Sequence, residues 1–207
     1  MNIDRFRALA AVNNGFQFTT RYVVEIAIPE RLQEFITNTT FTSEFSENND
    51  YYLRSDEMLQ LMCSGVASPS ITFNTAEVKR LGYGPSTTYP LDLKYSDINL
   101  TFLVDSAGRI QNIFHKWIAL MMENSDGTDT SYFFEYKSAY TTQLKIKLLD
   151  NSNNKNFIYV MEDAYPVSIG ESALMWDQSE VLRLPVMFKF KKYYAVKAVE
   201  GLDNAVT

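Results

Sequence analysis

The clearest regular pattern in the chain is an apolar stripe at helical spacing after residue 106. Its large apolar residues recur every three or four positions, so they share one face of a helix. They are Ile110, Ile113, Phe114, Trp117, Ile118 and Met121. Ser106 has the residue type that favours the N-cap position, and Glu123–Gly127 ends the stripe. We predict a helix anchored by Phe114 and Trp117, with its apolar face covering a sheet or a neighbouring subunit.

Other segments alternate apolar and polar residues or are rich in β-branched residues, which is typical of strands with one buried face. We predict strands in the segments Arg21–Ile28, Met58–Cys63, Leu91–Asp105, Gln143–Leu149, Phe157–Met161 and Val181–Tyr194. Pro185 interrupts the last of these. Because proline donates no backbone hydrogen bond, we expect this closing strand to lie at a sheet edge or to carry a bulge there.

The remaining segments read as an opening helix, turns and loops. Residues 2–13 show helical spacing and end at Asn14-Gly15, while Gly82, Gly84 and Pro85 mark a turn between two extended segments. We therefore expect a mainly β fold, an antiparallel β-sandwich or barrel of about six to eight strands with one packed α-helix. The chain is expected to form a single domain, 1–207, with a polar loop near 37–50 and a flexible C-terminal tail near 196–207.

Composition narrows the function more by exclusion than by assignment. With 46% hydrophobic residues, 14 Phe and 13 Tyr, the chain has enough apolar surface to fold. Its net charge of −6 comes without a basic stripe, which argues against stable DNA binding. The single cysteine, Cys63, and the single histidine, His115, supply neither a disulfide nor a zinc site. We expect no cofactor, no resident metal, no signal peptide and no membrane span, and hence synthesis in the cytoplasm.

The sequence offers little catalytic chemistry. His115 points off the apolar stripe, and Cys63 follows an apolar run where a buried, inert thiol is expected. Carboxylates that could serve as an acid–base pair fall at strand ends and turns, where acidic residues commonly cap and solvate the chain. They are Asp92, Asp97, Asp105, Glu162 and Asp163. We expect no catalytic residue, and so no enzyme.

The many aromatic residues raise an alternative, because stacked Tyr and Phe rings can bind sugars or bases. Most of them alternate at the strand period, as core residues do. A carbohydrate-binding module therefore stays open as an alternative, and it requires glycan binding by a monomer.

Several segments taken in order resemble the tail tube proteins of contractile-tailed bacteriophages. The resemblance begins with Phe6 and Arg7 in the opening helix and continues through the strand 21–26 and the segment 59–69, which enters a small-residue and proline turn. It ends with Tyr165, Pro166 and Gly170 in a turn, a short segment bearing Trp176, and the closing strand.

The resemblance implies a structural protein of the virion, assembled in the host cytoplasm. Copies would form sixfold rings whose sheets merge into a barrel, and stacked rings would form a tube inside a contractile sheath, joined to a baseplate. DNA would pass through the lumen without stable binding, which an acidic wall favours. The residues expected to serve structure or assembly are Phe6, Arg7, Phe114, Trp117, Tyr165, Pro166, Gly170 and Trp176, while the opening helix and the 37–50 loop would touch the next ring. Two related roles stay open: a tube-initiating protein of the baseplate and a bacterial secretion-system tube protein.

Overall fold

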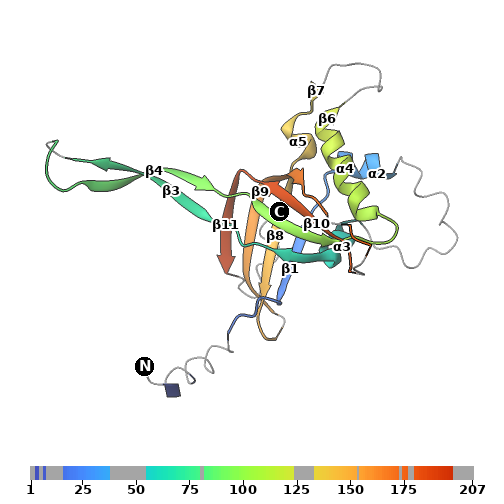
Figure 1. Ribbon diagram of the computed structural model, residues 1–207, viewed down its shortest axis with the longest axis horizontal. Helices are drawn as coiled ribbons and strands as arrows, with labels where there is room; N and C mark the ends of the chain where they lie inside the picture. Colours follow the sequence, from blue (N-terminus) through green and yellow to red (C-terminus); the bar gives the residue numbers. More distant parts are fainter. Residues whose placement is uncertain are drawn as a thin grey trace.

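The computed structural model describes residues 3–4, 7, 16–37, 55–79, 82–123, 133–152, 154–172, 174–176 and 180–197. Within these residues seven strands form one curved antiparallel sheet, in the order β1-β8-β9-β10-β5-β2, with β11 also paired to β9 (Figure 1). The strands are β1 (Tyr22–Ile26), β2 (Cys63–Val66), β5 (Ile98–Leu103), β8 (Thr142–Leu149), β9 (Lys155–Ile169), β10 (Arg183–Lys189) and β11 (Lys192–Lys197). The predicted mainly β, antiparallel fold is confirmed.

The long strand β9 divides this sheet into two parts. Its first part pairs with β8 and β11, and its last part pairs with β10. Between them Asp163 adopts a left-handed backbone, with φ 54°, and the register with β8 shifts nearby. An extra residue at such a bulge bends a strand sharply. We refer below to β1, β8, β9 and β11 as the first sheet and to β9, β10, β5 and β2 as the second.

The predicted turn at Tyr165 and Pro166 is wrong, because both residues continue β9. Pro166 lies opposite Phe188 of β10, at a point where the register shifts between Met187 and Phe188. A bulge tolerates proline because the regular hydrogen-bond ladder is already interrupted there. The short strand predicted at 157–161 is thus only the first part of a longer one.

The closing strand was predicted as one element but is broken at Phe190 and Lys191 into β10 and β11. Pro185 does not lie at a sheet edge, since β10 runs between β9 and β5. Its carbonyl accepts a hydrogen bond from the Gly170 N–H at 2.7 Å, where β9 ends. Pro185 therefore lies opposite the point where β9 ends, so no regular hydrogen bond of the sheet is lost through its missing N–H. This makes proline tolerable in a central strand.

Besides the opening helix, of which only residues 3, 4 and 7 are described, the described part of the fold has four helices and two further hairpins. The helices are α2 (Glu30–Thr37), α3 (Ser55–Met62), α4 (Arg109–Met121) and α5 (Lys137–Tyr140); the hairpins are β3 (Ile71–Val78) with β4 (Thr87–Tyr95), and β6 (Met122–Glu123) with β7 (Phe133–Phe134). The helix α4 is the predicted one. The others go beyond the single packed helix that the pattern indicated.

The strand predicted at Met58–Cys63 is a correction: these residues belong to α3 up to Met62, and only Cys63 begins a strand. Met58 and Leu59 are buried, and Met62 packs against the core one turn later. This spacing fits a helix as well as it fits a short apolar strand. The helix lies against β1, and the Tyr22 hydroxyl donates to the Cys63 carbonyl at 3.5 Å, so α3 brings the first and second sheets together.

The helix α4 begins differently from the prediction. Ser106 is not its N-cap. Gly108 holds that position with φ 66°, and because glycine has no side chain it makes no side-chain capping hydrogen bond. Instead the Asp105 carboxylate accepts hydrogen bonds from the backbone N–H groups of Arg109, at 2.8 Å, and Ile110, at 3.4 Å. A carboxylate at this end is also favoured by the helix dipole.

The core is centred on the apolar face of α4, as the stripe predicted. Phe114 and Trp117 are completely buried and contact Phe102 of β5 and Phe188 of β10 through their rings. Trp117 also donates from Nε1 to the Tyr140 carbonyl at 2.8 Å. The helix therefore covers the inner face of the second sheet and fixes α5 beside it.

Candidate assembly surface

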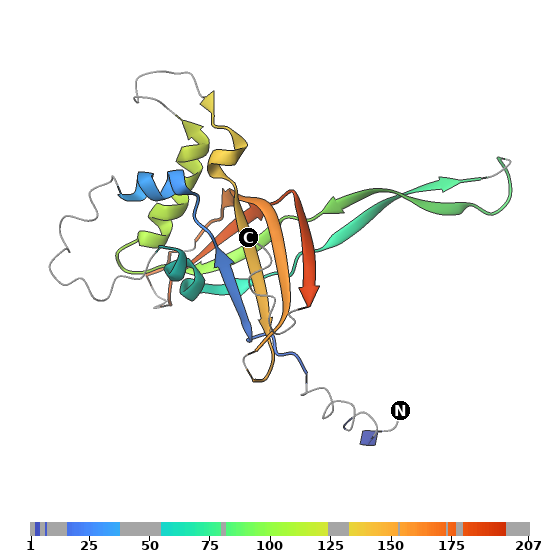
Figure 2. The same cartoon turned by 180° about the vertical axis from the view of Figure 1, so that it is seen from behind.

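The hairpin of β3 and β4 is the most prominent feature outside the core. It extends from the body on the side opposite α4, as both views show (Figures 1 and 2). Its strands pair along their whole length, from Ile71 opposite Tyr95 to Val78 opposite Thr87. At roughly 3.3 Å per residue the hairpin reaches about 25–30 Å. We call residues 71–79 and 82–95 the arm.

The local sequence explains why the arm ends where it does. Gly82 and Gly84 have φ of 74° and 88°, values that side chains strongly disfavour, and the Gly82 N–H donates to the Lys79 carbonyl at 3.3 Å. The turn predicted at these glycines and Pro85 is confirmed. What the pattern did not reveal is that neither strand joins the main sheet.

The arm is apolar although almost all of it is exposed. Only Ala76 and Tyr95 are partly covered among the described arm residues. The large apolar side chains that stay exposed are Ile71, Phe73, Val78, Tyr83, Tyr89, Leu91 and Leu93. An apolar surface of this extent on a two-stranded ribbon is typical of a contact with another protein.

A register shift divides the arm into two halves. On the side near the body Phe73 lies opposite Leu93; beyond the shift between Asn74 and Thr75, Ala76 lies opposite Tyr89. Leu91 has no direct partner, so it is the extra residue. Because side chains alternate along a strand, Phe73 and Ala76 lie on opposite faces of the ribbon. The apolar side chains therefore change faces halfway along the arm.

The base of the arm is fixed to the body by aromatic rings. Tyr95 contacts Phe190 with ring centroids 5.8 Å apart and Tyr193 at 5.5 Å. Tyr193 in turn contacts Tyr159 of β9 at 6.1 Å. Burial raises the pKa of Tyr193, and its neighbours Tyr159 and Tyr95 raise it further. These ring contacts fix the base of the arm, at Tyr95, against the body.

Two strands at the borders of the first sheet have pairing capacity left. In the part of the chain that is described, β11 pairs with β9 alone and β1 pairs with β8 alone. An edge strand of this kind presents backbone N–H and C=O groups that can pair with another chain.

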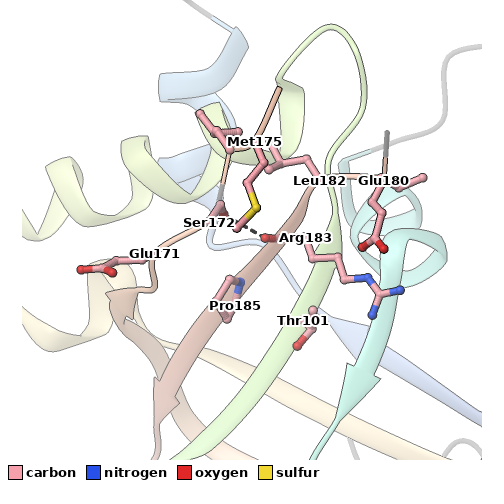
Figure 3. A pocket seen from close by; sticks show the side chains of 10 residues that line it. Thr101, Glu171, Ser172, Met175, Glu180, Leu182, Arg183 and Pro185 are labelled. Atoms are coloured by element: carbon pink, nitrogen blue, oxygen red, sulfur yellow. Dashed lines mark hydrogen bonds between the residues drawn. The ribbon is translucent and has the colours of Figure 1, made fainter. Parts of the chain in front are cut away.

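A groove lies on the outer face of the second sheet. Thr101 and Pro185 form its floor, and the segment that joins β9 to β10 forms its walls (Figure 3). Its volume is about 450 Å³. The residues that line it are Thr101, Glu171, Ser172, Leu174, Met175, Glu180, Val181, Leu182, Arg183 and Pro185. The Ser172 hydroxyl donates a hydrogen bond to the Arg183 carbonyl at 2.8 Å, which links the two ends of this segment.

The residues predicted to shape the end of the chain take different places around this groove. Gly170 lies at its border, where an added Cβ would come within 2.7 Å of the Pro185 ring, so only glycine fits without a shift. Tyr165 is half-buried and contacts Tyr140, and Pro166 is buried. Trp176 is fully exposed. Their role in assembly stays a prediction.

The opening helix is described only in part. Arg7 is helical and exposed, whereas Phe6 lies outside the described residues. Most of the polar loop predicted near 37–50 also lies outside them, and its first residue, Thr37, ends α2. The predicted tail near 196–207 begins inside β11, and residues 198–207 are not described.

The residues considered for catalysis are spread over the molecule. Asp97 lies 3.8 Å from Lys189, Glu162 pairs with Lys192 at 3.0 Å, and Asp163 pairs with Lys137 at 3.1 Å. Asp105 caps α4 and Asp92 lies on the arm. No three acidic, cysteine or histidine side chains in the described part of the chain gather closely enough to hold a metal ion.

The single histidine, His115, and the single cysteine, Cys63, also lie in surroundings that give no sign of a catalytic role. His115 is exposed on α4. Cys63 is half-buried, and burial raises the pKa of its thiol to about 11. A thiol with this pKa stays protonated at neutral pH and is a poor nucleophile. Among the helices described, none is long and apolar enough to cross a membrane.

Comparison with known proteins places the chain in a family. The model of the phage tail tube protein family matches residues 17–196. The chain belongs to the phage tail tube protein family. No curated protein matches its sequence.

Solved structures share the fold at low sequence identity. One, from the tube-terminating cap of the anti-feeding prophage, has a TM-score of 0.59 at 14% identity and covers 88% of this chain and 92% of that chain. A second, from the sheath–tube complex of the extracellular contractile injection system PVC in its extended state, has a TM-score of 0.57 at 11% identity, covering 88% and 93%. A third, from the anti-feeding prophage baseplate, has a TM-score of 0.55 at 11% identity, covering 88% and 97%.

Proposed function

We propose that this chain is the repeating subunit of a phage tail tube: six copies form a ring, and stacked rings enclose a lumen through which DNA is ejected. The observation that carries the proposal is the first sheet, which ends in β1 on one side and β11 on the other, each paired on one side only in the described fold. A sheet with a usable strand at each border can continue from copy to copy. When the rotation between copies closes, such repeated contacts form a ring.

The face of the first sheet that points away from the core would line the lumen. The register places Glu25, Lys145, Glu162 and Lys192 on this face. Lys147 on the same face is paired with Glu25, and Lys192 with Glu162. Lysines already paired with carboxylates offer less to passing phosphates. With two of its three named lysines paired with carboxylates, this mixed face would let DNA pass without stable binding, and it replaces the uniformly acidic wall expected from the net charge.

The partners we infer are other copies of the chain, a sheath around the tube and a baseplate at its end. The structures of similar fold come from a sheath–tube complex, a baseplate and a cap. In this setting the protein is a structural part of the virion tail, assembled in the host cytoplasm. A tube-initiating subunit of the baseplate is the second candidate, because a chain of this fold occurs in a baseplate structure.

Sedimentation velocity of the purified protein tests the proposal. We expect large assemblies whose amount rises with protein concentration. A variant in which residues 72–94 are replaced by a short glycine-rich turn serves as the control. It should stay folded, because none of the buried core residues comes from the arm, and it should assemble less. A wild-type protein that stays monomeric and binds glycans would instead support the carbohydrate-binding alternative.

A further inference from the structure

We propose that the outer half of the arm of one copy, residues 75–79 and 82–91, docks into the groove of a second copy. This inference rests on the proposed function, since it names the contact by which tube subunits would hold one another. It adds a specific pair of surfaces that the family match does not supply.

The arm cannot fill the groove of its own chain. The arm leaves the body just before β5 begins at Ile98, and it points away from α4 (Figures 1 and 2). The groove lies by Thr101 and Leu182, toward the end of β5 that leads to α4. The Leu182 carbonyl accepts a hydrogen bond from Val104 at 3.0 Å, which fixes the groove there. Because the paired ladder holds the arm extended, its outer half can reach only another molecule.

The outer half of the arm has the side chains that a protein-binding groove accepts. Tyr89 and Leu91 are 56% and 75% exposed, and Tyr83 at the turn is exposed as well. Tyrosine is enriched among the residues that dominate interface energies, because a large ring brings much apolar area with little loss of side-chain freedom. Because these side chains stay exposed to water, folding of the arm alone gives them no stabilising burial.

The groove is apolar where it is open. Leu174 and Met175 on one wall, and Val181 on the other, are all more than half exposed. The floor at Thr101 and Pro185 belongs to central strands and is therefore held rigidly. A rigid floor with exposed apolar walls and a volume near 450 Å³ suits one or two large side chains.

Charge favours the arm over other apolar occupants. Glu171 and Glu180 stand on opposite sides of the groove, and Arg183 is its only basic lining residue (Figure 3). Next to the turn of the arm the sequence reads Lys79-Arg80, while Glu77 is the sole acidic residue of the outer half. A net positive tip meeting a net negative groove steers two copies into one orientation.

The placement of the two surfaces also explains why the contact would propagate. A projecting arm on one side of the body and a receiving groove toward the other make a head-to-tail contact. Such contacts do not saturate at a dimer; they continue until a ring closes or a filament grows. A self-complementary contact of the same size would stop at two copies.

Charged substitutions test the contact without touching the core. Tyr89→Asp with Leu91→Asp on the arm, and Leu174→Asp with Met175→Asp in the groove, should each raise the protein concentration for half-assembly by roughly tenfold or more. Thr75→Asp with Thr88→Asp is the matched control, because it adds the same two negative charges at exposed positions on the other face of the arm. All variants should melt like the wild type, since the substituted residues are exposed.

Crosslinking then shows whether the two surfaces meet. With Cys63 replaced by serine, one chain carries Tyr89→Cys and a second carries Leu174→Cys, and the two are mixed before mild oxidation. We expect a covalent dimer from the mixture and little from either chain alone, or from Thr88→Cys with Leu174→Cys. If the wild type assembles but neither this pair nor Leu91→Cys with Met175→Cys crosslinks, and the charged variants assemble normally, the docking proposal is overturned while the tube proposal stands. A wild type that never assembles overturns both.

Discussion

At the scale of single residues, the buried side chains explain stability better than any chemistry. Trp117 combines complete burial, a hydrogen bond to the Tyr140 carbonyl and ring contacts with Phe114 and Phe188. Its spacing from Phe114 was sufficient to predict that both face the core, because a helix places residues three apart on one side.

Replacing Trp117 by alanine should lower the free energy of unfolding by about 3 kcal/mol or more, since a large ring is lost and the Tyr140 carbonyl loses its donor. Thermal or denaturant unfolding measures this directly. Trp176→Ala is the control: its side chain is fully exposed, so its melting temperature should match that of the wild type. An unchanged melting temperature for Trp117→Ala would contradict the assignment of this residue to the core.

Asp105 gives a pH-dependent contribution. Burial alone would raise the pKa of this carboxyl, but the hydrogen bonds from the Arg109 side chain and from two backbone N–H groups outweigh burial and hold the pKa below its ordinary value. A group whose pKa is lower in the folded state stabilises the fold above its unfolded pKa. That stabilisation disappears as the pH falls through the folded pKa.

Asp105→Ala should therefore cost about 1 kcal/mol of unfolding free energy at pH 7, the usual value for a lost helix cap. The difference from the wild type should shrink as the pH is lowered below about 4, the ordinary range of an aspartate pKa. Denaturant unfolding at pH 7 and pH 3 provides the comparison. A cost that is equal at both values would show that the carboxylate charge is not involved.

At the scale of elements, the sequence correctly predicted the helices and strands whose apolar pattern fits only one type of secondary structure. The stripe of α4 and the alternation of β5 and β8 each fit a single period over many residues. The run at Met58–Cys63 is too short to separate a helix from a strand, and the acidic residues Asp56 and Glu57, which favour a helix start, were the signal that could have decided it. The direction of the arm could not be predicted, because alternation shows that a face is apolar but not what covers it.

Leu59→Ala tests the role of α3. Leu59 is completely buried, whereas Leu61 of the same helix is 65% exposed. We expect the first substitution to cost about 3 kcal/mol and the second less than about 0.5 kcal/mol in chemical denaturation. Equal small effects would mean that α3 does not join the first and second sheets as described.

At the scale of the whole molecule, a single copy leaves a large apolar surface exposed to solvent. The arm exposes a series of large apolar side chains, the groove exposes another set, and the border strands β1 and β11 each keep one side for pairing within the described fold. The family match and the shared fold of tube, baseplate and cap proteins agree with a protein that functions as an assembly. The sequence could indicate assembly only through its family resemblance, because contacts with other chains produce no periodic pattern of apolar residues.

Electron microscopy of the purified wild-type protein tests the central claim most directly. Viewed end-on, the particles should be hollow rings with sixfold symmetry, and side views at higher concentration should show rings stacked into tubes. Averaged images that show only compact single copies at every concentration would contradict the account.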